Sequence, residues 1–249
     1  MGLALLSGIS RASAERVDLP VRGKTIALTL YQPNVPAAHV KGTIFMGSGD
    51  VGWVGLAVST AEFLRDNGYV VVGLNVRQYL STFRIGDRHL TVTDVPGDFS
   101  VIAEYLRHRN LLRPPVVLSG VSEGAALAVL AASSQANHLW IDGVITVGLP
   151  ATAELAWRWT DFTSWITKKD SAEPSFASKD YVGAVSPKPL WMIQSTTDEY
   201  VTEADYRELE SVARAPRTLV LIRASNHRFT DRIPELLRAY LAALDDIRK

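Results

Sequence analysis

The stretch that most constrains the fold is the pentapeptide Gly120–Gly124, with the sequence GVSEG. The apolar run Pro114–Ser119 before it is typical of a buried strand, and the helix formers Ala125–Ala132 after it predict a helix. Gly-x-Ser-x-Gly between a strand and a helix is the pattern of a nucleophile elbow, in which a strained Ser122 is held above the sheet edge. Glycine is needed on both sides because a Cβ would collide with the neighbouring strand or helix. The alternative is an ordinary turn whose serine caps the helix.

The rest of the chain alternates strand and helix patterns from about residue 42 onward. Apolar or alternating runs predict further strands at 16–21, 24–31, 42–46, 69–76, 143–148, 190–194 and 218–222, the first two as an antiparallel hairpin. Helical spacing of apolar residues predicts helices at 56–67, 98–109, 203–213 and 234–247. Residues 77–95 carry few pattern cues and are expected to form a polar connection. The alternation predicts an α/β fold, with a mostly parallel sheet of about eight strands and helices on both faces.

Length and composition favour a single domain over residues 16–249. The chain has 249 residues, of which 47% are hydrophobic, and this is enough for one large core. A formal net charge of zero does not suggest a nucleic-acid partner, and no stretch reaches the ~20 apolar residues of a membrane span. The absence of cysteine excludes disulfides and thiolate chemistry. Oligomeric state is not predicted by any of these features.

Residues 1–15 have two interpretations. A short apolar run is followed by Ala12-Ser13-Ala14, which matches the small-x-small pattern before a signal-peptidase cut, although a basic region is missing. The segment is either the remnant of a signal peptide or a loose N-terminal arm. The first interpretation predicts a periplasmic or secreted protein, and a cytoplasmic location is the alternative.

Residues 149–188 form a long insertion between two predicted strands. Such insertions in compact domains are usually functional, and this one holds half of the six tryptophans of the chain. We expect a lid or substrate wall in which Trp157 and Trp159 contact the substrate. The alternative is that these tryptophans, with Trp165, pack a small helix onto the body of the domain.

A serine nucleophile needs a base, and the base needs an acid to orient it. In a fold with this elbow the chain order is serine, then Asp or Glu, then His. Asp198 follows the strand at 190–194, and His227 follows the last strand, so both are expected at the sheet edge that presents Ser122. Glu199 is the competitor of Asp198, which is favoured because it comes first after the strand. The other histidines fit better as surface residues: His39, His89, His108 and His138.

An oxyanion hole requires two backbone N–H groups aimed at the developing negative charge. One is expected from Glu123, the residue after the nucleophile, and the other from Asp50 in the glycine-rich turn after the strand at 42–46. Gly49 is the alternative donor and is expected to allow close approach of the substrate. A glycine-rich turn can also bind phosphate, but no Lys with Ser or Thr follows in the spacing of a nucleotide-binding loop. No cofactor or metal is expected.

The elbow, Asp198, His227 and the alternating strands resemble the α/β-hydrolase superfamily over nearly the whole chain. Within it, the turn 47–53 (GSGDVGW) resembles the Ser-Gly-Asp-Gly-Gly-Trp turn of the VirJ/AcvB-like virulence-associated proteins. The segments 72–75 and 77–80 are similar to that family too, as are Asp161, Phe162 and Trp165 in the insertion. Departures are Val51 in place of a glycine, Glu123 where the family usually has an aromatic residue, and a single histidine in the loop at His227.

This resemblance implies a periplasmic protein and, from the AcvB-like members, a substrate related to aminoacylated phospholipid. The residues by themselves predict a cofactor-free serine hydrolase that cleaves an ester or similar acyl bond of a small-molecule substrate, and the resemblance implies that this substrate is lipid-like. Two alternatives remain open: an acyltransferase with the same triad, and a non-catalytic protein that uses the pocket only to hold a ligand.

Overall fold

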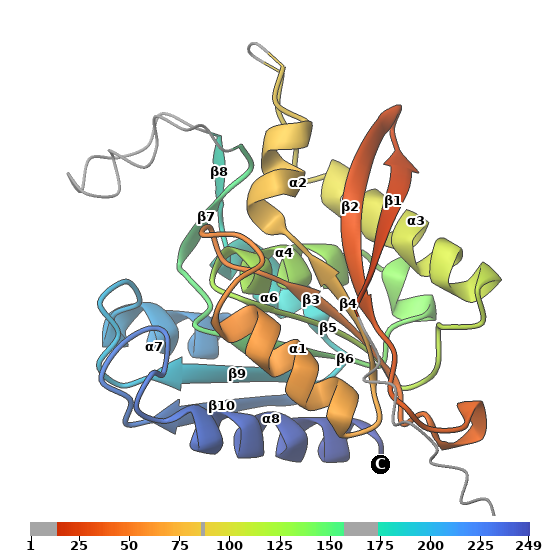
Figure 1. Cartoon of the computed structure of the whole chain (residues 1–249). Coiled ribbons are helices and arrows are strands. Elements are labelled where there is room, and N and C mark those ends of the chain that lie inside the picture. Colours follow the sequence, from red (N-terminus) through yellow and green to blue (C-terminus); the bar gives the residue numbers. More distant parts are fainter. Residues whose placement is uncertain (1–13, 86–87, 157–173) are drawn as a thin grey trace, which may run out of the picture.

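A computed structural model describes residues 14–85, 88–156 and 174–249. Its centre is an eight-stranded sheet with the order β1-β2-β4-β3-β5-β6-β9-β10 (Figure 1). The first two strands form an antiparallel hairpin, β2 pairs antiparallel with β4, and all later pairings are parallel. The strands are β1 (Glu15–Val21), β2 (Lys24–Tyr31), β3 (Thr43–Gly47), β4 (Val70–Leu74), β5 (Val116–Val121), β6 (Gly143–Val147), β9 (Leu190–Ser195) and β10 (Arg217–Ile222). The predicted mostly parallel sheet is thereby confirmed.

Helices cover both faces of this sheet, as predicted. On one face α1 (Leu56–Asp66) and α8 (Ile233–Ile247) bury their apolar sides against β3, β4, β5 and β6 (Figure 1). On the other face lie α2 (Val76–Thr82), α3 (Asp94–His108), α4 (Glu123–Ala132) and α7 (Glu203–Val212). Helix α4 is almost entirely buried, because its sequence of small and aliphatic residues has no polar side beyond its first turn. Among the described residues, no helix is both long and apolar enough to cross a bilayer.

The stretch 77–95 differs from the expected polar connection. Helix α2 occupies its first part and begins at the cap Asn75, whose side chain accepts a hydrogen bond from the backbone N–H of Gln78. Its seven residues are too few to show a clear helical period. Helix α3 begins at Asp94, four residues earlier than predicted, because Pro96 is tolerated in a first turn, where backbone N–H groups have no partner within the helix.

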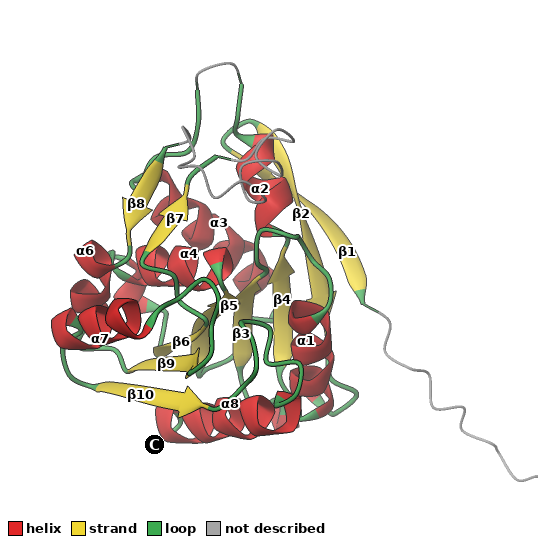
Figure 2. Cartoon of the chain, turned by 90° about the vertical axis from the view of Figure 1, so that its left-hand side faces the viewer, coloured by secondary structure: helices red, strands yellow, loops and turns green. Residues whose placement is uncertain are grey.

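The insertion at 149–188 contributes a second, two-stranded sheet. β7 (Thr152–Glu154) pairs antiparallel with β8 (Ser175–Ala177), and the chain continues into α6 (Lys179–Val182) and a 3₁₀ turn at Gly183–Val185. Figure 2 shows the β7–β8 pair outside the central sheet. Trp157, Trp159 and Trp165 lie outside the described residues, as do residues 1–13 of the predicted N-terminal segment.

A buried chain of hydrogen bonds ties α8 to the strand that carries the elbow. Tyr240 of α8 donates to the hydroxyl of Ser119 in β5 at 2.5 Å, and Ser119 donates to the carbonyl of Ile145 in β6 at 2.6 Å. Each buried hydroxyl therefore has a partner, which avoids the cost of an unsatisfied polar group. The elbow strand is fixed from below by this contact.

Candidate active site

Ser122 sits in the strained turn that the sequence predicts. Its φ of 53° and ψ of −120° lie in a region that residues with a side chain rarely adopt, and its backbone N–H donates to the carbonyl of Val147 at 2.9 Å. The neighbouring glycines make the turn possible. A Cβ on Gly120 would lie 2.1 Å from the backbone of Gly124, and one on Gly124 would lie 2.4 Å from the backbone of Gly47. β3, β5 and α4 therefore meet in van der Waals contact beneath the serine.

The structure brings Asp198 and His227 together from the loops after β9 and β10. Oδ2 of Asp198 and Nδ1 of His227 are 2.6 Å apart, and the side chain of Asp198 is fully buried. Its other oxygen accepts the backbone N–H groups of Tyr200 and Val201 at 2.8 and 2.9 Å. Burial opposes ionisation, but the hydrogen bond and charge of His227 outweigh it and lower the pKa of Asp198. An ionised Asp198 requires Nδ1 to carry the proton of the imidazole.

Glu199, the competitor of Asp198 in the sequence, has a different contact. Its carboxylate accepts the backbone N–H of His227 at 2.8 Å. The two adjacent acids thus hold one residue at two points, the ring by Asp198 and the main chain by Glu199. This double attachment fixes both the position of the loop and the orientation of the imidazole.

The imidazole of His227 is enclosed, with only 6% of the residue exposed. Its ring lies against Gly148, where φ is +61° and a Cβ would be 2.6 Å from Cε1. The ring of Tyr200 lies nearly perpendicular to it, with 5.3 Å between the ring centres and 84° between the ring planes. Burial lowers the pKa of His227, but the hydrogen bond and charge of Asp198 outweigh this effect and raise it.

The other ring nitrogen of His227 is unsatisfied. Nε2 is buried and has no hydrogen-bond partner among the described residues. Because Nδ1 carries the proton, Nε2 presents a lone pair, which is the form of a general base. The imidazole lies near Ser122. Its ring packs on Gly148, and the preceding residue, Val147, accepts the backbone N–H of Ser122 through its carbonyl.

The glycine-rich turn after β3 lies directly against the elbow. A Cβ on Gly49 would be 3.6 Å from the Cβ of Ser122. The backbone N–H of Asp50, one of the two predicted oxyanion donors, points to the elbow and donates to the carboxylate of Glu123 at 3.1 Å. Glu123 is half-buried, and burial together with the nearby charge of Asp50 raises its pKa.

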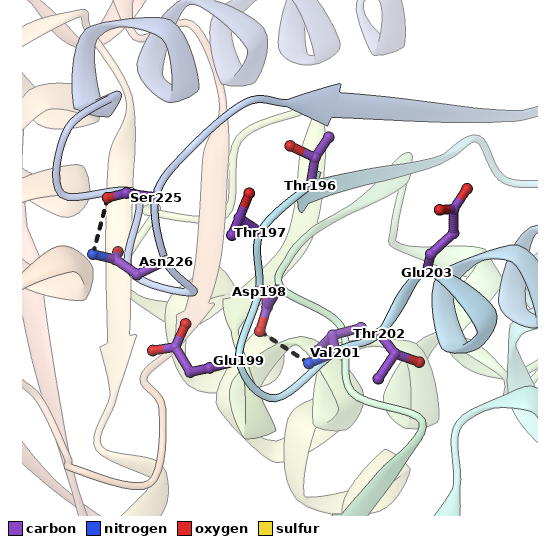
Figure 3. Close-up of a pocket in the computed structure, with 9 residues that line it drawn as sticks. All are labelled: Thr196, Thr197, Asp198, Glu199, Val201, Thr202, Glu203, Ser225 and Asn226. Atoms are coloured by element: carbon purple, nitrogen blue, oxygen red, sulfur yellow. Dashed lines mark hydrogen bonds between the residues drawn. The ribbon is translucent and has the colours of Figure 1, made fainter.

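A cavity of about 580 Å³ opens beside Asp198, on the side of the loops that follow β9 and β10 (Figure 3). Its lining is hydroxyl-rich and acidic and comprises Thr196, Thr197, Asp198, Glu199, Val201, Thr202, Glu203, Ser225 and Asn226. The described lining includes neither Ser122 nor Gly49. Within the described parts of the chain, no group of three His, Asp or Glu side chains is arranged to hold a metal ion.

Gly148 and Tyr200 contact the ring of His227 but are not marked in the sequence pattern. Gly148 continues an apolar run and is predicted as a strand residue, although β6 ends at Val147. The available cue for Gly148 is its position: a glycine that ends a strand at the functional edge of a parallel sheet allows another group to approach the backbone closely. No comparable cue exists for Tyr200, because its contact depends on how the loop after β9 folds back.

Comparison with known proteins agrees with this architecture. The uncharacterized protein YfhR of Escherichia coli O157:H7 is 25% identical over 239 residues, covering 91% of this chain and 78% of YfhR. Est1E from Butyrivibrio proteoclasticus superposes with a TM-score of 0.67 at 15% identity, covering 94% of this chain and 99% of Est1E. The α/β hydrolase GrgF from Penicillium sp. sh18 gives a TM-score of 0.72 at 11% identity, covering 95% and 99%. These structures show that the fold is that of the α/β hydrolases.

The family described as bacterial virulence protein (VirJ) matches residues 42–244 of this chain. The match runs from the start of β3 to the last turns of α8 and therefore contains the elbow and both loops that meet at His227. Since it covers most of the sequence, the protein belongs to the VirJ family of bacterial virulence proteins.

Proposed function

We propose that this protein is a serine hydrolase that cleaves an ester or similar acyl bond through an acyl-enzyme on Ser122. The observation that carries the proposal is the 2.6 Å hydrogen bond between His227 and Asp198, combined with a buried Nε2 that has no other described partner. A histidine held in this way is oriented and electrostatically prepared to accept a proton. The strained backbone of Ser122 supports the same assignment, because it is the conformation that exposes a nucleophile above a sheet.

In the proposed reaction, Oγ of Ser122 attacks the acyl carbon while Nε2 of His227 takes the hydroxyl proton. Asp198 stabilises the imidazolium that forms. The carbonyl oxygen becomes an oxyanion and accepts the N–H groups of Asp50 and Glu123. Collapse of this intermediate expels the alcohol, which takes the proton from His227. Water then attacks the acyl-enzyme by the same route, and the carboxylic acid leaves.

The proposed substrate is a small-molecule or lipid-like acyl ester. Trp157 and Trp159, which lie outside the described residues, remain the proposed apolar wall for the acyl chain. We also propose a periplasmic or secreted location, which rests on the small-x-small pattern near residue 14.

Replacement of the nucleophile tests the proposal. Ser122→Ala is expected to retain the wild-type melting temperature and to lower kcat for p-nitrophenyl esters by on the order of 10⁴ to 10⁶. Ser211→Ala, an exposed serine on α7, is the matched control and should keep full activity. A Ser122→Ala variant with more than about a tenth of the wild-type rate would show that Ser122 is not the nucleophile.

A further inference from the structure

The side chain of Glu123 lies where the proposed reaction would place the substrate oxyanion. Its carboxylate accepts the backbone N–H of Asp50 at 3.1 Å, and its own backbone N–H also interacts with it. These are the two N–H groups assigned above to the oxyanion hole. Ser122 is close by, because a Cβ on Gly49 would lie 3.6 Å from the Cβ of Ser122 and 3.9 Å from Oε2 of Glu123. One carboxylate therefore engages both donors beside the nucleophile.

The base, in contrast, has no partner for its reactive nitrogen. Nε2 of His227 makes no hydrogen bond to any described residue, Ser122 included. The serine hydroxyl is thus not in contact with its base. This arrangement cannot start the reaction, because proton transfer requires contact between the hydroxyl and Nε2.

We infer that Glu123 is an internal occupant of the oxyanion hole, which keeps the site in a resting state until a substrate carbonyl displaces the carboxylate. The inference rests on the proposed function and adds a regulatory step to it. The N–H groups of Asp50 and Glu123 belong to the backbone of tight turns, so they stay in place when the Glu123 side chain rotates away. Displacement exchanges one acceptor oxygen for another and leaves both N–H groups to the substrate oxygen.

The surroundings of Glu123 explain why a neutral carbonyl is able to compete with a full negative charge. Partial burial and the charge of Asp50 both disfavour the ionised side chain. Its position in the first turn of α4 favours it, since the positive end of the helix dipole lies there. The opposing effects leave a carboxylate that is bound but displaceable. In shape and charge it resembles the carboxylate of the released product.

If Glu123 occupies the oxyanion hole, it should slow the reaction of Ser122 with a small reagent that makes few other contacts with the protein. We would measure the second-order rate of labelling of Ser122 by a small fluorophosphonate. Glu123→Ala is expected to raise this rate by about 10- to 100-fold, the range typical of losing a hydrogen bond to a charged group. Glu123→Gln keeps an acceptor for the N–H of Asp50 without the charge and should give an intermediate rate. Glu235→Ala, an exposed first-turn glutamate of α8, is the matched control and should change nothing.

Acetate provides a readout that a merely structural role would not change. In Glu123→Ala the vacated hole is expected to bind acetate, which should slow labelling back toward the wild-type rate as its concentration rises. The wild type, whose hole is filled by its own carboxylate, should be insensitive to the same acetate at constant ionic strength. Thermal melts of all variants would be measured beside the rates. If Glu123→Ala melts below the assay temperature, the labelling rate of Glu123→Gln tests the inference in its place.

The outcomes separate this inference from the proposed function. Specific labelling of Ser122 in the wild type, with an unchanged or slower rate in folded Glu123→Ala and Glu123→Gln, would overturn the resting-state role and leave the serine hydrolase intact. A faster rate in Glu123→Ala without any effect of acetate would also overturn it. Failure of Ser122 to label in all three proteins would refute both proposals.

Discussion

Gly148 provides a sharp test of how the imidazole of His227 is positioned. A Cβ at Gly148 would lie 2.6 Å from Cε1 of His227, whereas carbon atoms pack best at about 3.5–4.0 Å. In Gly148→Ala the ring must therefore retreat by about 1 Å from its place beside Ser122. A shift of this size in a catalytic group is able to cost roughly 100-fold in rate. The backbone adds a second effect, because alanine at a φ of +61° costs about 1–2 kcal/mol of stability.

Gly23→Ala separates the two effects. Gly23 has a φ of +74° in the β1–β2 hairpin, but no atom lies within 4 Å of where its Cβ would be. Both variants should lower the melting temperature by a few degrees, and only Gly148→Ala should lower kcat/KM for a p-nitrophenyl ester, by about 100-fold. Activity of Gly148→Ala within threefold of wild type, or an equal loss in Gly23→Ala, would refute the positioning argument.

Three further predictions follow from the site. Asp198 raises the pKa of His227 above its usual 6.5, and only the neutral imidazole is a base, so kcat/KM should rise with pH through a midpoint above 6.5. Asp198→Asn should move this midpoint to lower pH, and a flat profile from about pH 5 to 9 would argue against a histidine base. Glu199→Ala removes the acceptor for the backbone N–H of His227 and should lower kcat/KM by about 10-fold, which steady-state kinetics would detect. An unaltered kcat/KM would mean that this contact does not position the loop. Trp157→Ala or Trp159→Ala should reduce kcat/KM for long-chain esters about 10- to 100-fold more than for acetate esters, whereas an equal loss on both would exclude an apolar wall.

Much of the fold is predictable because buried strands and helices have recognisable apolar patterns in the sequence. The strands β3 to β6 and β9 lie under helices on both faces, so each is a mostly apolar run. The shorter elements are not recognisable in this way. Each strand of the β7–β8 pair has three residues, too few for a period of two to be distinguished from chance. Their position depends on packing of β7 against α4 and of β8 against α6 rather than on local pattern.

The candidate site is predictable where the fold fixes the order of residues along the chain. Ser122, Asp198 and His227 follow from the elbow and from the ends of two later strands, and the structure brings the acid and the histidine into contact. The direction of the Glu123 side chain does not follow from sequence, because it depends on the backbone N–H of Asp50, 73 residues away. Such contacts arise from tertiary geometry and have no local pattern.

The most direct test of the central claim is to identify the residue that reacts with a fluorophosphonate. The folded protein would be labelled, digested and analysed by tandem mass spectrometry, with His227→Ala treated in parallel. We expect one adduct, on Ser122, whose formation is largely lost in His227→Ala. An adduct on a different residue, or no adduct in the wild type and in Glu123→Ala, would contradict it.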